Sequence, residues 1–466
     1  MKAFLPLVLA AALAGCAAIP PGEPGQEPLQ GKQLGLQEQN INWPTEAWWQ
    51  RYQDPQLDGL MAEALAGNPS LAAAQARLGM ANAAVSGARA VQLPQLNANY
   101  SLLRERFSEN YIYPPPYGGS MQTDNSLRLN LDFDLDLWGK NRARYAAAVS
   151  QRDASEADVQ VARNALVGAM VQSYFNLQNA LAQHRVITQI VKQQEDVLAI
   201  TRQRVAAGLD TEVEVNQADS AVSAARVQLS QAATNAELLR NQIAALAGAG
   251  PQRGQQVQEA TLSHDPVALP EQLPMELLGR RPDVVAAKLR VQASASEISA
   301  AKAEFFPNVN LSAFAGFMSL GLSNLRQSGS QTYGVGPAIS LPIFHGGALS
   351  ANLEGKRAGR DLAIAEYNQT LLTAVREVAD ATAAIRALQQ QTADQAASLR
   401  AITSAYDIAV KRYKSGLGNF VQVLLAQNEV QKQSILNTDM LARAYKLDAQ
   451  LATALGGGYQ AATTTH

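Results

Sequence analysis

The sequence repeats itself over most of its length, and this duplication restricts the possible folds more than any other feature. Arg204–Ala218 (RVAAGLDTEVEVNQA) aligns with Arg412–Ala426 (RYKSGLGNFVQVLLA) at an offset of 208, that is 412 − 204. In each half, two prolines that lie 25 residues apart also bracket an amphipathic helix (94 − 69 and 307 − 282). A repeat of this size indicates one large unit present twice, rather than a solenoid of short repeats.

Each half is predicted to run as a short helix, a strand, a loop, a strand, a very long helix, a tight turn and a long helix. Proline is absent from residues 139–205, which allows a helix of roughly 100 Å at about 1.5 Å per residue. Residues 364–413 carry a heptad repeat of apolar side chains, typical of packed helices. Gly208 and Gly416 are expected to cap the long helices in the left-handed conformation, so the two tips should lie together.

Four strands are predicted, at residues 95–104, 125–137, 308–318 and 332–344. The clearest stretch, Leu127–Leu137, reads LRLNLDFDLDL, with apolar residues at odd positions and polar residues at even positions. This alternation predicts a strand with one apolar and one polar face. A soluble sandwich gives the same pattern, but about 11 residues also suit a tilted strand that crosses a bilayer.

The N-terminus resembles the signal of a bacterial lipoprotein. Lys2 precedes an apolar run, residues 3–14, that is too short to cross a membrane as a helix. The run leads into Leu-Ala-Gly-Cys ending at Cys16, which is similar to a lipobox, whose cysteine becomes the lipidated first residue. Ala17, in place of Asp, favours the outer membrane. An ordinary signal with a chance cysteine is the alternative, and the tether that follows, residues 16–42, is expected to be extended and poorly packed.

The composition argues against several classes of function. The formal net charge is −2, so no polyanion-binding surface is indicated and nucleic acid is not an expected partner. The four histidines are scattered, and no spacing of His, Asp and Glu suggests a metal site. Because no clustered polar site or phosphate-binding glycine loop is present either, we expect neither an enzyme nor a cofactor, apart from the lipid on Cys16.

Four strands cannot close a barrel alone, because the smallest bacterial outer-membrane barrels have eight and an open edge in lipid leaves backbone groups unpaired. Three copies would supply twelve strands, above a matching ring of long helical hairpins. A periplasmic adaptor or coiled-coil spacer would share the hairpins without needing the strands, and this alternative stays open.

Three further motifs resemble those of the TolC-like outer-membrane efflux lipoproteins, in particular their NodT-like branch. They are FFPNVNLSAFAGF (residues 305–317), RRPDVVAAKLRV (280–291) and VGPAISLPIFHGG (335–347), and the similarity extends over residues 48–457. The resemblance implies a mixed membrane fold: a trimeric 12-stranded transmembrane β-barrel with four strands per chain, continued by a long periplasmic α-helical barrel and a mixed α/β equatorial belt.

The resemblance also implies a function, the exit duct of a tripartite efflux pump. Such a duct is a homotrimer in contact with outer-membrane lipid. It passively conducts drugs or other toxic small molecules from a periplasmic adaptor (membrane fusion protein) and an inner-membrane pump of the RND or MFS type to the exterior. A duct for type I protein secretion is the alternative.

The predicted regions follow from the duplication and the signal. They are a signal peptide (1–15), a lipidated tether (16–42), the equatorial segment and short helix of repeat 1 (43–94), barrel strands 1 and 2 (95–137), the long hairpin of repeat 1 (138–248), the equatorial segment and short helix of repeat 2 (249–306), barrel strands 3 and 4 (307–344), the long hairpin of repeat 2 (345–457) and a C-terminal tail (458–466).

A gate at the periplasmic helix tips is a further implication of the resemblance. Tyr413 matches the family's tyrosine before the tip glycine, and Glu214 matches the carboxylate after the glycine of the first hairpin. Gly418 and Gln422 stand at positions that are basic or acidic in the family, and the next acidic position is Leu425. An acidic ring from the second hairpin is therefore not expected.

The constriction is instead predicted to be an apolar collar of Val421 and Leu425, with charge supplied by Glu212, Glu214 or Asp219. The alternative is that the tip charges only solvate a turn and that the two apolar residues pack between helices.

Four residues of the second strand, Arg128, Asp132, Asp134 and Asp136, are predicted to face the barrel lumen. The three aspartates would keep the lumen wet and mildly favour cations. Solvation without selectivity is the alternative.

Overall fold

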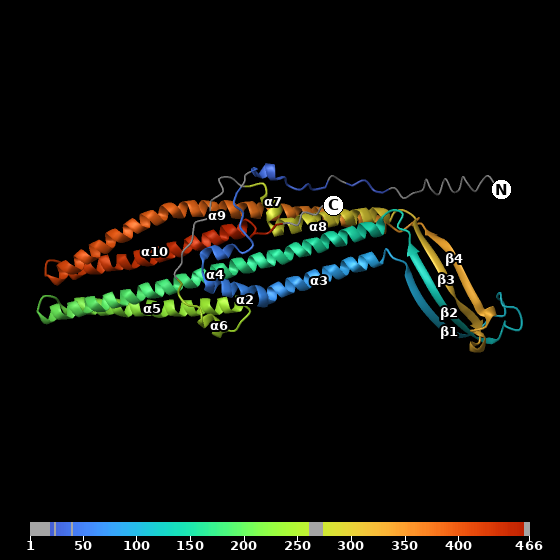
Figure 1. Ribbon diagram of the computed structural model, residues 1–466, viewed down its shortest axis with the longest axis horizontal. Coiled ribbons are helices and arrows are strands. Elements are labelled where there is room, and N and C mark those ends of the chain that lie inside the picture. Colours follow the sequence, from blue (N-terminus) through green and yellow to red (C-terminus); the bar gives the residue numbers. More distant parts are fainter. Residues whose placement is uncertain (1–18, 23–24, 39–40, 261–273, 461–466) are drawn as a thin grey trace. The chain divides into compact units, whose positions relative to one another are not determined.

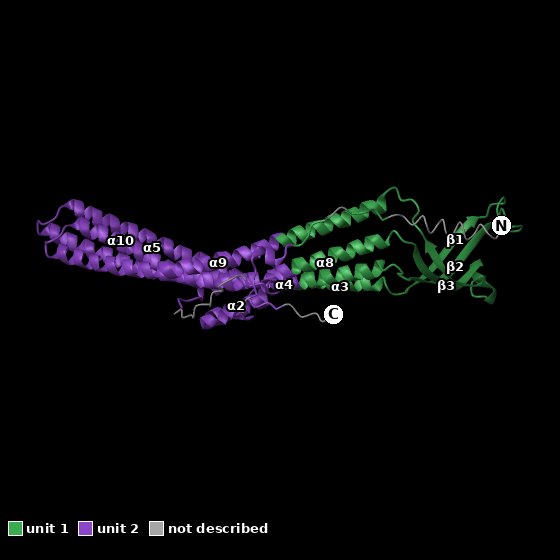
Figure 2. Cartoon of the chain, turned by 90° about the horizontal axis from the view of Figure 1, so that it is seen from above, with its two compact units in different colours: residues 1–28, 77–156, 286–368 green, residues 29–76, 157–285, 369–466 purple. Residues whose placement is uncertain are grey.

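The computed structural model describes residues 19–22, 25–38, 41–260 and 274–460 (Figure 1). The predicted signal peptide and Cys16 lie outside the described residues, as does the end of the predicted tail. The chain divides into two compact units, residues 1–28, 77–156 and 286–368 in one and residues 29–76, 157–285 and 369–466 in the other (Figure 2). None of the described helices is long and apolar enough to cross a membrane.

The element order confirms the duplication. The first half contains α3 (Pro69–Ala90), β1 (Gln95–Arg106), β2 (Met121–Asp134), α4 (Lys140–Ala206) and α5 (Glu212–Leu246). The second half contains α8 (Pro282–Ala303), β3 (Asn308–Leu320), β4 (Gln331–Ser340), α9 (Ala348–Lys414) and α10 (Phe420–Ala454). Helices α4 and α9 are each 67 residues long and α5 and α10 each 35, so the two hairpins match in length.

Shorter helices lie around the repeats. They are α2 (Pro55–Gly67), α6 (Pro251–Gln255), α7 (Leu277–Arg280) and the 3-10 helices η1 (Gly31–Leu34), η2 (Trp48–Tyr52), η3 (Leu322–Asn324) and η4 (Ser328–Ser330).

The four strands form one antiparallel sheet in the order β1-β2-β3-β4. All four predicted strands are present, but three of the predicted boundaries are off by three or four residues, and β2 begins at Met121 instead of Asn125. Strand β2 ends at Asp134 instead of Leu137, because Asp136 has a φ of 46° and turns the chain toward α4. Strand β4 ends at Ser340 instead of Phe344, just before Pro342, which has no N–H to donate to a ladder.

The long helices pack through the predicted heptad positions. Along α9 the side chains of Ile364, Leu371 and Val378 are fully buried, and Tyr413 at the far end of the same stripe is 1% exposed. The tips are turned as expected, with φ values of 74° at Gly208 and 76° at Gly416. Apolar burial along one stripe therefore holds the helices of each hairpin side by side.

The same joint recurs where each hairpin returns to its short helix. The side-chain amide of Asn68 donates to the Leu246 carbonyl (2.9 Å), and the Arg281 guanidinium donates to the Ala454 carbonyl (3.1 Å). The two carbonyls are 208 positions apart (454 − 246), so both repeats satisfy the last carbonyls of a hairpin with the residue that precedes the short helix.

The N-terminal tether is better packed than predicted. The Arg357 guanidinium of α9 donates to the carbonyls of Pro20 (2.7 Å) and Pro21 (3.4 Å), and the Gln26 N–H donates to the Asp361 carboxylate (2.9 Å). Farther along, Leu36 is only 3% exposed. The tether therefore has local anchor points, where polar side chains supply the partners that its extended backbone needs, although most of its described residues are exposed.

The space around two left-handed glycines, Gly208 at a tip and Gly456 after α10, predicts an unequal response to alanine. A Cβ at Gly208 would meet no heavy atom within 4 Å, whereas one at Gly456 (φ 97°) would lie 1.9 Å from the Arg280 carbonyl oxygen. We expect Gly208→Ala to cost about 1 kcal/mol for the left-handed conformation alone. Gly456→Ala should cost more than about 3 kcal/mol, because backbone must also move. Thermal unfolding of the purified protein measures both, and equal losses would contradict this explanation.

Candidate functional site

The antiparallel register gives the sheet one apolar face that continues across all four strands. Directly opposed residues share a face, and the pairs Leu96↔Leu131, Leu127↔Phe317 and Ala315↔Tyr333 are apolar. Tyr333, Val335 and Ile339 of β4 are 70–81% exposed. An apolar surface of this kind, left open in the single chain, is typical of a surface that contacts lipid or another protein.

The other face of the sheet is polar and contains three of the four predicted lumen residues. Ser312 of β3 donates to the carboxylate of Asp132 (2.9 Å), and Asn130 donates to Asn99 of β1 (3.3 Å). The guanidinium carbon of Arg128 lies 5.2 Å from the centre of the Phe314 ring, in a cation–π contact. Hydrogen-bonding groups of three strands therefore line one surface.

The carboxylates of Asp134 and Asp136 accept hydrogen bonds from residues at the start of α4. Asp134 accepts from the Asn141 side chain (3.0 Å) and lies 3.4 Å from the Lys140 ammonium. Asp136 lies beyond the strand, accepts the N–H groups of Asn141 (2.8 Å) and Arg142 (2.9 Å), and pairs with the Arg142 guanidinium. The prediction that Asp136 belongs to the polar strand face is therefore wrong; its carboxylate caps a helix.

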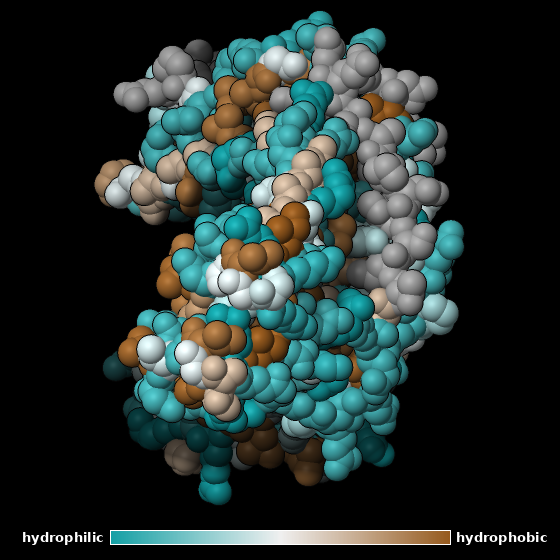
Figure 3. All heavy atoms as spheres, turned by 90° about the vertical axis from the view of Figure 1, so that its left-hand side faces the viewer, coloured by the Kyte–Doolittle hydropathy of each residue, from teal (hydrophilic) through white to brown (hydrophobic). Residues whose placement is uncertain are grey.

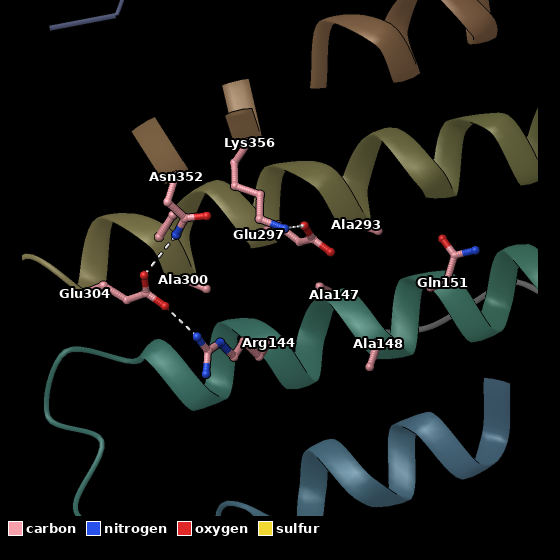
Figure 4. A pocket seen from close by; sticks show the side chains of 11 residues that line it. Arg144, Ala147, Ala148, Gln151, Ala293, Glu297, Ala300, Glu304, Asn352 and Lys356 are labelled. Carbon is pink, nitrogen blue, oxygen red and sulfur yellow. Dashed lines mark hydrogen bonds and ion pairs between the residues drawn. The ribbon is translucent and has the colours of Figure 1, made fainter. Parts of the chain in front are cut away.

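A groove of about 530 Å³ lies between α4, α8 and α9 in the same unit. Arg144 and Glu304 point toward each other across it (Figure 4), with 2.5 Å between the guanidinium and the carboxylate, and the Asn352 amide lies 3.0 Å from the same glutamate. Lys356 of α9 pairs with Glu297 of α8. Each charged side chain that lines this groove has a partner of opposite charge. These ion pairs connect the three helices.

A partly buried polar cluster joins the two hairpin tips. The Arg204 guanidinium of α4 forms two hydrogen bonds with the Asp210 carboxylate (2.7 and 3.2 Å) and donates to the Tyr413 carbonyl of α9 (2.8 Å). The Tyr413 hydroxyl donates to Asp210 and lies 3.3 Å from the Thr201 hydroxyl. We call Arg204, Asp210 and Tyr413 the tip latch, because they connect one hairpin to the other.

Charge and burial set the protonation states of this latch. The Arg204 guanidinium, through its hydrogen bonds, holds the pKa of Asp210 below its usual range. Burial raises the pKa of Tyr413, and the hydrogen bond to Asp210 adds to this shift. At neutral pH the latch therefore consists of a charged carboxylate, a charged guanidinium and a neutral phenol that donates its proton.

The predicted gate residues lie at the tips but make other contacts. The Glu214 carboxylate accepts the Thr211 N–H (2.9 Å) and hydroxyl (2.5 Å), which is a capping box at the start of α5. The carboxylate that Tyr413 contacts is therefore Asp210 and not Glu214. Asp219 lies 3.6 Å from Arg202, with both side chains about 60% exposed, and Glu212 occupies the first turn of α5.

The two residues of the predicted apolar collar, Val421 and Leu425, are exposed in the single chain. Val421 is 54% exposed and Leu425 is 65% exposed, so neither packs between the helices of its own chain. Leu209 and Leu417, in the two tip turns, are 63% and 73% exposed. At this end of the chain, apolar atoms interrupt a largely hydrophilic surface (Figure 3).

Sequence reasoning missed Arg204, Asp210 and Thr201. Arg204 was inside the aligned segment, and Asp210 is the charged counterpart of Gly418 at the offset of 208 (418 − 210). That difference between the repeats was a usable signal. Among the residues that the structure describes, no three His, Cys, Asp or Glu side chains gather into a metal site.

Comparison with known proteins identifies the family. The chain matches the model of the outer membrane efflux protein family at residues 60–249 and 273–457. It is 31% identical to the multidrug resistance outer membrane protein MdtP of Escherichia coli, over 96% of this chain and 94% of that protein. It is 35% identical to the fusaric acid resistance protein FusA of Burkholderia cepacia, over 76% of this chain and 68% of that protein.

A solved structure shows the same fold. The outer membrane protein VceC of Vibrio cholerae has a TM-score of 0.85 and 34% sequence identity, over 90% of this chain and 100% of that one. The repeated hairpins, the four-stranded sheet and these similarities agree, and the chain belongs to the outer membrane efflux protein family.

Proposed function

We propose that this chain is the outer-membrane exit duct of a tripartite efflux pump, through which drugs or other toxic small molecules leave the periplasm passively. The observation that carries the proposal is a sheet with one exposed apolar face and one polar face, joined to helices of 67 residues. Such a sheet suits a wall between lipid and water, and helices of roughly 100 Å suit a passage across the periplasm. The names of MdtP and FusA, a multidrug and a fusaric acid resistance protein, support a small-molecule cargo.

The duct is a homotrimer that encloses a 12-stranded barrel and a helical barrel below it. Strands β1 and β4 each have one neighbour in the sheet, so each chain presents two unpaired edges. Pairing β4 of one copy with β1 of the next satisfies both edges, and three copies supply twelve strands. The polar faces, with Arg128 and Asp132, then line the lumen.

The tip latch is the gate in this proposal. It joins α4 to α9 through the contact of Tyr413 with Arg204 and Asp210. Separating the hairpins breaks a charge-assisted set of hydrogen bonds, so the closed state is favoured at rest. Val421 and Leu425 form the apolar collar around the narrowed opening.

The remaining parts of the proposal concern location and partners. Cys16 carries the lipid that anchors the tether in the outer membrane. The exposed tips receive a periplasmic adaptor, and an inner-membrane pump of the RND or MFS type supplies the energy and selects the cargo. The duct itself has no catalytic task.

The assembly state tests the shared barrel. Protein extracted in detergent should have a mass close to three times that of the mature chain, because unpaired strand edges make the isolated chain unfavourable in lipid. Native mass spectrometry of the full chain provides the measurement. A stable monomer that stays inserted in membranes would contradict the barrel and the duct together.

The latch predicts which carboxylate controls resting conductance. Asp210→Asn combined with Tyr413→Phe should raise the resting conductance in planar bilayers at least about tenfold, since hydrogen bonds to charged groups contribute about 1.5–3 kcal/mol. Glu214→Gln is the matched control. Its carboxylate caps α5, and we expect wild-type conductance. Opening by the control, or a closed double variant, would reject the latch.

The latch also predicts the direction of pH dependence. Because the pKa of Asp210 is lowered, its contribution to the closed state is complete above the ordinary aspartate value of about 3.9 and is lost as the pH falls through the lowered value. The resting pore should therefore stay closed from neutral pH to about 4.5 and open only in stronger acid. Conductance measured against pH tests this, and Asp210→Asn should abolish the acid step. Opening of the wild type near pH 6 would contradict it.

A further inference from the structure

Apolar clusters join the two hairpins at two levels. Near the tips, Val197 and Leu198 of α4 pack with Tyr413 of α9 and Val423 of α10. At the other end of the hairpins, Phe175 of α4 stacks on Tyr445 of α10, with ring centres 4.8 Å apart. Between these levels, polar side chains largely replace the apolar contacts between α4 and α10.

A cavity of about 520 Å³ occupies that middle level. It is open to the surface, and its walls combine amides, hydroxyls and apolar side chains with the ion pair of Arg185 and Glu259 (3.2 Å). From α4 they include Asn179, Val186 and Gln189, and from α10 they include Ser434, Asn437 and Thr438. The volume is large enough for several water molecules, and the polar walls would bind them.

One carboxylate spans the seam at the edge of this cavity. The Asp439 carboxylate of α10 accepts the side-chain amide N–H groups of Asn179 (2.8 Å) and Gln183 (2.6 Å), both on α4. Both donors reach the same oxygen, Oδ1. Hydrogen bonds to a charged acceptor are stronger than neutral ones, so this is the strongest type of polar contact a seam of amides can make.

Some other polar side-chain atoms of the described hairpins are buried and have no hydrogen-bond partner. The side-chain oxygen of Asn179 is buried without a hydrogen bond, and so are both polar atoms of the Gln427 side chain. Gln427 is 2% exposed and lies toward the tips from Asp439 along α10. Because buried unpaired polar groups are unfavourable, water admitted beside Asn179 would relieve its side-chain oxygen as the Asp439 contacts break.

We propose that Asp439 is a second tie between the hairpins, a positioning residue whose release from Asn179 and Gln183 lets water enter the seam as the gate opens. The proposal rests on the gating part of the proposed function and deepens it, because it extends the moving interface from the tip latch along α4 and α10. Asp439 acts beside the apolar clusters and the Lys446–Asn176 hydrogen bond (3.1 Å), and its contacts break together with the tip latch when the hairpins separate.

The first test is Asp439→Ala, with Asp380→Ala as its matched control. Asp380 pairs with Arg376 within α9 (3.0 Å) and does not bridge the hairpins. Resting conductance of the trimer in planar bilayers should rise roughly tenfold in Asp439→Ala, from the loss of hydrogen bonds to a charged group, and should not change in the control.

A reversible cross-link separates gating from a general loss of packing. Cysteines at positions 179 and 439 are introduced into the conducting Asp210→Asn/Tyr413→Phe variant, and Cys16 is present in every protein compared. A bifunctional methanethiosulfonate reagent that bridges the two thiols should return the conductance to the wild-type level, and a thiol reductant should cleave the bridge and raise the conductance again. A merely structural role for Asp439 would give no such reversal.

The outcomes distinguish this inference from the proposed function. If the tip variant conducts but the cross-linked protein conducts equally well, or Asp439→Ala stays closed, the second tie is wrong and the duct and its latch stand. If neither the tip variant nor Asp439→Ala raises conductance, the gate at the tips fails and the second tie fails with it.

Discussion

Backbone hydrogen bonding is the constraint on which the rest of this structure depends. The sheet exposes an apolar face, which favours lipid, but β1 and β4 each leave one row of N–H and C=O groups unpaired. In hydrocarbon each such group costs several kcal/mol. A single chain in lipid would cover its apolar face but leave its strand edges without hydrogen-bond partners. In water the edges would be hydrated but the apolar face would be exposed. Edge pairing with further copies resolves the conflict, and the duplication supplies the strands in pairs that allow it.

The two halves keep the same lengths and differ in the side chains that occupy equivalent positions. Thr211 and Asn419, 208 positions apart, both cap the second helix of a hairpin through a side-chain oxygen. At the tip itself the halves diverge, since Asp210 has Gly418 as its counterpart. A Cβ at Gly418 would lie 3.2 Å from the Arg412 Cβ, so this turn leaves little room for a larger residue. The latch therefore needs an acid from one repeat and the tyrosine from the other.

Much of the fold could be predicted from the sequence, because long periodic patterns are averaged over many residues. The heptads, the tip glycines and the offset of 208 predict helices whose ends the structure confirms to within a few residues. The strand ends were less predictable. Asp136 continues the alternation of Leu127–Leu137, but an aspartate just before a helix also serves as a cap, and periodicity alone does not separate the two roles.

The candidate site was predicted less well than the fold, because a contact between hairpins is not visible in the pattern of either one. The position of Tyr413 near the tips follows from the sequence. Choosing Glu214 or Asp210 as its partner requires knowing which carboxylate already accepts local hydrogen bonds. Glu214 lies three residues after Thr211, the spacing of a capping box, and this local use occupies it. Asp210 sits in the turn, where Arg204 and Tyr413 both reach it.

Burial explains why salt weakens the Arg204–Asp210 pair of the tip latch less than the exposed Arg202–Asp219 pair, which lies within the first hairpin. The side chains of Arg204 and Asp210 are each 12% exposed, whereas those of Arg202 and Asp219 are 61% and 60% exposed. Exposed pairs contribute little, and salt screens them over about 8 Å at physiological ionic strength. Buried pairs are screened far less. The Arg204 guanidinium also lies 4.5 Å from the centre of the Tyr413 ring. It therefore contacts Tyr413 both through this cation–π interaction and through the hydrogen bond to the Tyr413 carbonyl. The charge-assisted contacts between the hairpin tips are therefore concentrated where the two repeats meet, at Arg204, Asp210 and Tyr413.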